Sequence, residues 1–353
     1  QGGADIVKGY GGDDVIRAGA AFGADDQING GDGDDVLMLD GDYSAGVVFG
    51  ARTLVGVERI EYTAGHDYDL TLSDRAAGSS SNPEGPILSI SGIELGGKFP
   101  KDAAVRKPLL DSYRLDLVGG WFSGNLLARD VEAEIAAAQD HLALLKAMGS
   151  TVFVHAETSN AIHGLRGAPL SQTPRLDADR WDSFGARLTG FAQYVQGEGL
   201  RFAYHHHLGT VVEQPGDLEM FLAVTGEAVG LTLDTGHAAL GGIDPVAVIR
   251  ACPARIAHVH CKDVRAGVFD QVQARGQSFL DGVLAGMFTV PGDGDLDYAA
   301  IMRALAKIDY AGWIVVEAEQ DPALADPRAY GELGLRTLER EAAAAGLKKA
   351  TRP

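Results

Sequence analysis

Residue types that commonly bind divalent cations stand at the ends of four separate apolar runs. They are Glu157, Asp234, His260 and Glu317. Three carboxylates and one imidazole suit a cation of borderline hardness such as Mn²⁺, Co²⁺ or Fe²⁺, and Zn²⁺ or Mg²⁺ could occupy the same site. A single acid in such a place is more often a helix N-cap or a surface charge. The recurrence on four runs favours a metal site.

Histidines gather beside two of these runs. His205, His206 and His207 close one run, and His237 lies three residues after Asp234. Because side chains alternate between the two faces of a strand, at most two of the three neighbouring histidines can face one pocket. We expect His206 to face it, and we expect the others to be packed or surface imidazoles. His237 could reach a metal-held substrate without binding the metal, or it could be an ordinary residue of the next helix.

Five further side chains lie within or shortly after apolar runs and are candidates for substrate contact; for Glu94 and Lys98 this role is what the family resemblance given below implies. They are Glu94, Lys98, Trp121, Asp263 and Arg265. Structural alternatives stand beside four of these five assignments. Glu94 and Lys98 could form a surface salt pair, Trp121 could belong to the core, and Arg265 could be solvated.

The elements that must position these residues alternate between short strands and helices from about residue 90 onward. Seven strands are expected, at 92–95, 115–119, 151–155, 202–206, 230–234, 256–260 and 313–317. Apolar residues at helical spacing predict a helix over 131–148, which Gly149 ends. This alternation favours a (β/α) barrel, in which the active site lies at the C-terminal ends of the strands. The count is one short of the eight strands of a complete barrel.

The first 40 residues carry a different pattern, a repeat rich in glycine and aspartate. Asp5, Asp14, Asp26 and Asp35 recur at spacings of 9, 12 and 9, and each is followed two residues later by an aliphatic residue. The repeat resembles the nonapeptide repeats of RTX (haemolysin-type) calcium-binding proteins. That resemblance implies a small parallel β-roll in which the aspartates and turn carbonyls bind Ca²⁺. A flexible glycine-rich linker is the alternative.

Charge and composition divide the chain and exclude several partners. Residues 1–90 hold 16 acidic and 5 basic side chains, and the whole chain has a net charge of −19. Such an acidic balance disfavours binding to nucleic acid. The sequence has no apolar run long enough to span a membrane. We expect a repeat segment at 1–76, a linker at 77–90 and the barrel at 91–353.

Longer strings give the barrel segment a closer resemblance. The strings are IELGGKFP at 93–100, YHHHLGT at 204–210, LDTGHAALGG at 233–242, HVHCKDV at 258–264, FTVPGDG at 288–294 and VVEAEQDP at 315–322. They resemble inosose (2-keto-myo-inositol) dehydratases, which are xylose-isomerase-like TIM barrels. The resemblance covers about residues 91–345 and implies that the four strand-end residues are metal ligands, with Mn²⁺ or Co²⁺ as the cofactor.

The activity implied by this resemblance is the dehydration of 2-keto-myo-inositol (scyllo-inosose) to a trihydroxycyclohexane-1,2-dione in inositol catabolism. The partner would be a small cyclic ketopolyol, and a homo-oligomer is compatible with the sequence. Acid and base are expected among His206, His237, Glu157 and Glu317, with the individual roles open. Alternatives are a sugar epimerase or isomerase on the same scaffold, or an inactive barrel attached to a calcium-binding module.

The resemblance breaks at the start of the barrel. Inosose dehydratases have a strand and a helix before IELGGKFP, whereas only a few residues separate that string from the linker here. We therefore expect a TIM barrel that lacks its first strand and helix and is open at two strand edges, unless the segment 87–90 or a strand of the roll fills the gap. RTX repeats are typical of secreted proteins, but the barrel and its two cysteines suit the cytoplasm, so the pieces resemble a chimera, a fusion or a gene-model error.

Overall fold

The computed structural model describes residues 4–49, 53–57, 59–62, 68–72, 92–97, 99–100 and 102–348. The chain divides into two units, Gln1–Ser89 and Ile90–Pro353. The expected linker at 77–90, including the segment 87–90 proposed to fill the barrel, lies outside the described residues. None of the described helices is both long enough and apolar enough to cross a membrane.

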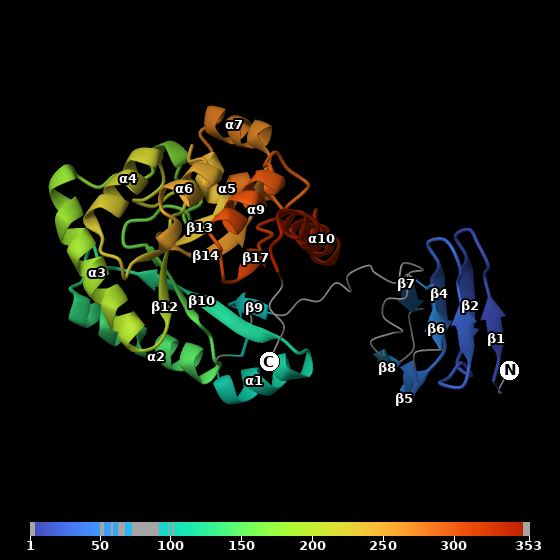
Figure 1. The fold of residues 1–353 in the computed structure, drawn as a ribbon. Coiled ribbons are helices and arrows are strands. Elements are labelled where there is room, and N and C mark those ends of the chain that lie inside the picture. Colours follow the sequence, from blue (N-terminus) through green and yellow to red (C-terminus); the bar gives the residue numbers. More distant parts are fainter. Residues whose placement is uncertain are drawn as a thin grey trace. The chain divides into compact units, whose positions relative to one another are not determined.

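The strands of the first unit are β1 (Ile6–Lys8), β2 (Val15–Gly19), β3 (Gln27–Asn29), β4 (Val36–Asp40), β5 (Tyr43–Phe49), β6 (Leu54–Val55), β7 (Arg59–Tyr62) and β8 (Tyr68–Leu72). They pair in parallel as β1-β3-β6, β2-β4-β7 and β5-β8. Figure 1 shows these strands as a stack of short segments.

The first unit is the parallel β-roll that the repeat predicts. Val7 pairs with Ile28, and Ile16 pairs with Leu37, so the first two coils are 21 residues apart. This offset is the sum of the 9- and 12-residue spacings of the aspartates, because alternate repeats belong to different sheets. Ile28 and Leu37 are buried in the small core of the roll, whereas Val7, on the first coil, is 40% exposed.

The strands of the second unit are β9 (Gly92–Leu95), β10 (Asp116–Gly124), β11 (Val152–Glu157), β12 (Arg201–His205), β13 (Gly230–Asp234), β14 (Ile256–Cys261), β15 (Asp263–Val264), β16 (Phe288–Thr289) and β17 (Ile314–Val316). The helices are α1 (Ala103–Ser112), α2 (Val131–Ala147), α3 (Trp181–Gly197), α4 (Pro215–Val224), α5 (Thr235–Leu240), α6 (Pro245–Ala251), α7 (Ala266–Ala274), α8 (Phe279–Leu284), α9 (Tyr298–Lys307) and α10 (Pro327–Ala345).

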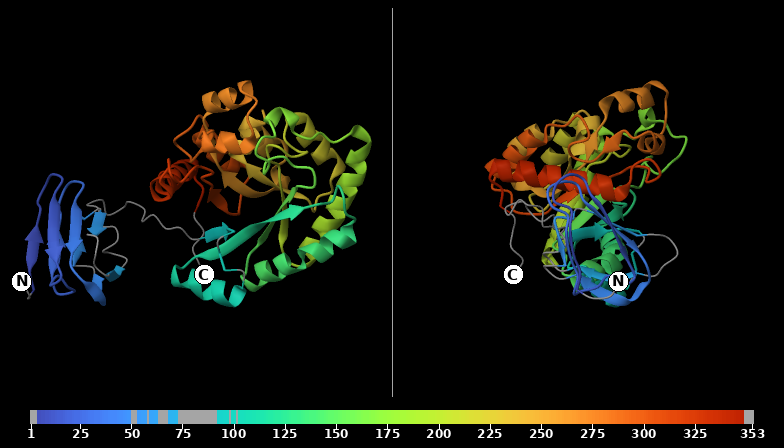
Figure 2. Two further views of the ribbon diagram at one scale, coloured as in Figure 1. Left: turned by 180° about the vertical axis from the view of Figure 1, so that it is seen from behind. Right: turned by 90° about the vertical axis from the view of Figure 1, so that its right-hand side faces the viewer.

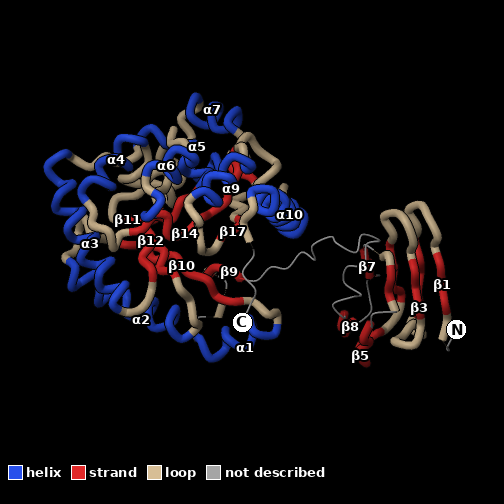
Figure 3. Tube along the Cα trace, in the orientation of Figure 1, coloured by secondary structure: helices blue, strands red, loops and turns tan. Residues whose placement is uncertain are grey.

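Seven of these strands form one parallel sheet with the order β17-β14-β13-β12-β11-β10-β9. All seven predicted strands are present, with ends shifted by a few residues, and β10 is longer than expected. Among the described residues no strand joins β9 to β17, so this part of the chain supplies seven strands of the barrel sheet. Figures 2 and 3 show the helices on the outside of the curved sheet.

Alternation along the strands separates an outer aromatic layer from a narrow interior. Phe153 of β11 and Phe202 of β12 pack with Phe191 of α3 in the main core, with ring centroids 5.7 to 6.2 Å apart. Their neighbours Val154 and Ala203 belong to a separate small cluster inside the barrel. A side chain at the end of a strand therefore faces either the helices or the interior according to its parity.

Candidate metal centre and active site

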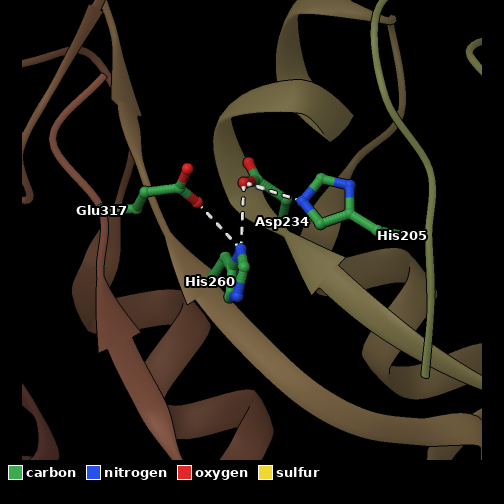
Figure 4. Close-up of side chains that lie close together, drawn as sticks. All are labelled: His205, Asp234, His260 and Glu317. Atoms are coloured by element: carbon green, nitrogen blue, oxygen red, sulfur yellow. Dashed lines mark ion pairs between the residues drawn. The ribbon is translucent and has the colours of Figure 1, made fainter. Parts of the chain in front are cut away.

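Four side chains converge at the C-terminal ends of neighbouring barrel strands. They are His205, Asp234, His260 and Glu317, and one ligand atom of each lies within 4.8 Å of the others. Nδ1 of His260 lies 2.8 Å from Oε2 of Glu317 and 3.8 Å from Oδ2 of Asp234 (Figure 4). The same Asp234 oxygen lies 3.5 Å from Nε2 of His205. The parallel order of β12, β13, β14 and β17 brings these residues together.

Local structure fixes how Asp234 contributes to the cluster. Asp234 is both the last residue of β13 and the N-cap of α5, and its Oδ1 accepts a hydrogen bond from the His237 N–H at 2.8 Å. The other oxygen, Oδ2, is buried and makes no hydrogen bond to a described residue. One carboxylate thus starts a helix and presents a second oxygen to the cluster.

The polar atoms of this cluster fit a divalent metal ion. Oδ2 of Asp234, Nδ1 of His260 and Oε2 of Glu317 are buried, and none makes a well-formed hydrogen bond within the described part of the chain. Buried polar atoms without hydrogen bonds are costly, and a shared cation would satisfy all three. With His205, the donor set contains two imidazoles and two carboxylates, which suits first-row transition metals.

Glu157, expected as a ligand and as an acid or base, lies outside the cluster. Its carboxylate accepts hydrogen bonds from the backbone N–H groups of Leu127 at 3.2 Å and Ser159 at 2.9 Å, and from the Ser159 hydroxyl. Glu157 has the parity of Phe153, which faces the helices, so the strand directs it away from the barrel interior. The structure replaces it with His205, one strand further along.

The three neighbouring histidines alternate as predicted, but the choice among them was wrong. His205 and His207 line the pocket, and His206 does not. His206 is buried, with neither ring nitrogen hydrogen-bonded to a described residue, and burial lowers its pKa to about 3. It therefore stays neutral at ordinary pH. On β12, His205 is on the inward face together with Ala203. The sequence alone did not show which histidine faces inward, because three identical residues are adjacent.

A pocket of about 320 Å³ lies beside the metal-binding atoms. Besides His205, His260 and Glu317 of the cluster, its lining includes Glu94, Trp121, His163, His207, His237 and Glu319. The predicted candidates Trp121, Glu94 and His237 therefore face the same space. The indole of Trp121 lies edge-on to His205, with centroids 5.2 Å apart, and provides a flat apolar wall. Lys98, another candidate, lies outside the described residues.

Glu94 reaches from β9 across the barrel to two histidines of β14. Its carboxylate lies 2.6 Å from Nε2 of His258 and 3.1 Å from Nε2 of His260. Burial would raise the pKa of Glu94, but the charge of His260 and these hydrogen bonds hold it well below its usual range. Glu94 is therefore an ionised partner of a ligand histidine, and it fixes Nδ1 of His260 toward the cluster.

Asp263 and Arg265, two other candidates for substrate contact, hold the loop that follows β16. The Asp263 carboxylate accepts backbone hydrogen bonds from Gly292 at 3.1 Å and Leu296 at 3.0 Å. The Arg265 guanidinium pairs with Asp293 and donates to the Gly286 carbonyl at 2.9 Å. Neither side chain lines the pocket, so the structure assigns both a structural role.

Lys262 is the principal residue of the site that the sequence reasoning missed. Its side chain is 1% exposed, and its Nζ lies 2.7 Å from Glu319, 3.2 Å from Glu317 and 3.6 Å from Asp234. Burial opposes the charge, but the carboxylates raise the pKa of Lys262 further above its usual value. The signal was present in the sequence, because residue 262 has the same parity on the strand as His260.

Lys262 controls the charge of the carboxylates around it. Burial would raise the pKa of Asp234, but the charge of Lys262 and the nearby imidazole of His205 lower it to about 2. Lys262 and His260 likewise hold the pKa of Glu317 well below its usual range against burial. Both carboxylates of the cluster are therefore ionised at neutral pH.

The four aspartates of the roll do not form such a centre. Among the described residues, every group of three or more candidate ligand side chains lies in the second unit. Oδ1 of Asp26 accepts from the Asp5 N–H, and Oδ1 of Asp35 accepts from the Asp14 N–H, both at 2.8 Å. These carboxylates thus link each coil to the coil 21 residues before it.

Comparison with known proteins gives the lineage of the second unit. The xylose isomerase-like TIM barrel family matches residues 92–341. The rhizopine catabolism protein MocC of Rhizobium meliloti is 46% identical over 258 residues, which are 73% of this chain and 79% of that protein. Inosose dehydratase 2 of Bacillus cereus is 38% identical over 246 residues, 69% of this chain and 83% of that enzyme.

Solved structures agree with the fold. The probable 3-DHS dehydratase AsbF from Bacillus anthracis aligns with a TM-score of 0.52 at 15% identity, covering 71% of this chain and 89% of that one. Identity this low supports the architecture alone. The family match and the curated relatives extend over most of the chain. The chain therefore belongs to the xylose isomerase-like TIM barrel family.

Proposed function

We propose that the chain dehydrates a small cyclic ketopolyol, 2-keto-myo-inositol (scyllo-inosose), to a trihydroxycyclohexane-1,2-dione with the help of a divalent metal. The observation that carries the proposal is the cluster of His205, Asp234, His260 and Glu317 beside a polar pocket of about 320 Å³. Relatives named inosose dehydratase at 36–38% identity support the choice of substrate.

The four cluster residues would hold the metal, which when bound supplies Lewis-acid polarisation of a substrate carbonyl. The pocket residues would make the remaining contacts with the substrate. Trp121 would support one face of the polyol ring, and His237, His207 and Glu319 would contact its oxygens. Dehydration also needs a group that accepts the proton on the carbon beside the carbonyl, and imidazoles are the neutral groups at hand.

The finer expectation for the metal is Mn²⁺ or Co²⁺. His205 takes the place of one expected carboxylate, so the donor set is less hard than the sequence predicted. This favours Co²⁺ over Mn²⁺ and makes Zn²⁺ a further candidate. We place the working site in the cytoplasm, where the free thiols Cys252 and Cys261 would stay reduced.

Enzyme assays test the proposed activity. The metal-free protein should gain dehydratase activity on inosose when Co²⁺ or Mn²⁺ is added, measured by absorbance of the dione. Rhizopine belongs in the same panel because MocC carries that name. A product of unchanged mass with altered stereochemistry would indicate an epimerase or isomerase instead. Absence of any product with all metals would mean that the incomplete barrel is inactive.

For the roll, we propose calcium binding as a separate function. The coils are stacked and acidic, and Oδ2 of Asp14 is buried without a hydrogen bond to a described residue. Because close carboxylates repel one another, Ca²⁺ should increase the β-structure of the roll. Circular dichroism of the full chain in millimolar CaCl₂ should show more β-signal than in EGTA, with MgCl₂ as the control. Identical spectra in CaCl₂ and EGTA would contradict calcium binding.

A further inference from the structure

A buried carboxylate outside the pocket joins the loops that follow β11 and β12. Glu213 is 8% exposed, and its Oε2 accepts a hydrogen bond from the Gly209 N–H at 2.6 Å. The same oxygen lies 2.9 Å from the Thr173 hydroxyl, and Oε1 lies 3.3 Å from the Arg175 guanidinium. Glu213 and Gly209 belong to the loop after β12, whereas Thr173 and Arg175 belong to the long segment between β11 and α3. One side chain therefore connects two segments that are distant in the sequence.

Gly209 extends this connection to a residue of the pocket. Its carbonyl oxygen accepts a hydrogen bond from the Ile162 N–H at 2.8 Å. Its φ of +78° lies in the left-handed region, which glycine adopts without strain. A Cβ at this position would lie 3.0 Å from the backbone nitrogen of His163. The loop after β12 therefore packs closely on the backbone that carries His163.

The two connected loops carry one wall of the pocket. His163 comes from the loop after β11 and His207 from the loop after β12, and both line the pocket with ring centroids 4.8 Å apart. Glu213 does not line this pocket. It can therefore affect a bound substrate only through the loops that it connects.

The turn that contains Thr173 also supports His207 from another side. The Leu170 N–H donates to the Gln277 carbonyl at 3.1 Å. Phe279 follows two residues later, and the centroid of its ring lies 5.1 Å from that of His207. Displacement of this turn would therefore reach His207 through Phe279 as well as through Glu213.

We infer that Glu213 is a positioning residue, which holds the loops after β11 and β12 together so that His163 and His207 form a preassembled wall for the substrate. The inference rests on the proposed dehydration of a ketopolyol. Without the contact to Gly209 the loops adopt other arrangements, and a substrate must restore the binding-competent one. The apparent affinity then falls with the competent fraction, whereas the saturated complex keeps its rate. Loss of the contact should therefore raise KM and leave kcat nearly unchanged.

Two conservative variants separate the reach of the carboxylate from its charge. Glu213→Gln retains an oxygen that can accept from the Gly209 N–H, whereas Glu213→Asp retains the charge on a side chain one methylene shorter. In Glu213→Asp we expect KM for inosose to rise by about tenfold with little change in kcat, as for a competent fraction of about one tenth. Glu213→Gln should have a KM near that of the parent. A parental KM in Glu213→Asp, equal losses in both variants, or a lower kcat at unchanged KM would each overturn the inference.

Hydrogen exchange tests the connection without substrate. In the full chain, mass spectrometry should show faster amide exchange of segments 158–173 and 207–214 in Glu213→Asp than in the parent, because the N–H groups of Gly209 and Ile162 lose protection. Glu198→Asp is the matched control, since Glu198 pairs with Lys146 at 2.6 Å at the C-terminal end of α3, and its exchange in both segments should be parental. Parental exchange in Glu213→Asp would overturn the inference whatever the substrate is. Failure of the wild-type chain on inosose would instead refute the proposed function, and hydrogen exchange would still decide whether Glu213 holds the loops.

Discussion

Asp234→Asn should lower the affinity for divalent metal by about tenfold or more, and dehydratase turnover should fall with it. Oδ2 of Asp234 lies 3.5 Å from Nε2 of His205 and 3.8 Å from Nδ1 of His260. The amide removes the negative charge, yet its oxygen can still cap α5 through the His237 N–H. The substitution should therefore change the cluster while preserving the fold. Metal content after gel filtration, at defined free metal concentrations, measures the effect.

Asp244→Asn is the matched control for this experiment. Asp244 caps α6 in the same manner, through the Val246 N–H at 2.8 Å, but it is exposed and lies outside the cluster. Its variant should bind metal like the parent protein. If Asp234→Asn also retains full metal stoichiometry at every concentration, Asp234 is not a ligand.

The arrangement of strands could be predicted from the sequence because each strand is a short apolar run between helical segments. All seven runs form strands of the barrel sheet, and the 9- and 12-residue spacings of the roll predict its parallel coils. The ends were less accurate. β10 continues to Gly124, where Gly124 pairs with Glu157 of β11, and this extension depends on a neighbouring strand rather than on local sequence.

Three of the four clustered side chains were named from the sequence, and the fourth shows what local reasoning lacks. Asp234, His260 and Glu317 face the interior, because the residues directly before them, Leu233, Val259 and Val316, pack in the outer core. Glu157 also ends a strand, but with the opposite parity; His155, two residues before it, pairs with Tyr204 of β12, which belongs to the outer core. Strand ends identify candidate ligands, whereas the pairing register decides which face they reach.

Residues that position other groups were harder to predict from the sequence than the candidate metal ligands. Asp263 and Arg265 follow the same strand as His260. Backbone N–H groups of a distant loop donate hydrogen bonds to Asp263, and a distant backbone carbonyl accepts a hydrogen bond from Arg265. Lys262 was overlooked because lysines are usually solvated. Three carboxylates from β13 and from the segment after β17 make its burial possible, and their position around residue 262 depends on the pairing of separate strands.

Lys262→Met should destabilise the metal-free protein by about 3–5 kcal/mol, because the substitution leaves buried carboxylates without their compensating ammonium. Nζ lies within 4 Å of Asp234, Glu317 and Glu319, and the methionine has a similar length without charge. A bound divalent cation would neutralise the same carboxylates, so metal should stabilise the variant more than it stabilises the parent. Urea unfolding of the barrel with and without Co²⁺ measures both effects.

Lys107→Met provides the comparison, since Lys107 pairs with Asp111 at 3.0 Å on the exposed surface of α1. Such a helix-surface pair contributes only about 0.3–0.5 kcal/mol, and the gain from Co²⁺ should equal that of the parent. Asp234→Asn and Lys262→Met then make opposite predictions within one cluster. Loss of a ligand charge weakens the stabilisation by metal, and loss of the competing ammonium strengthens it. An equal gain from Co²⁺ in Lys262→Met and in the parent would mean that Lys262 does not compete with a cation for these carboxylates.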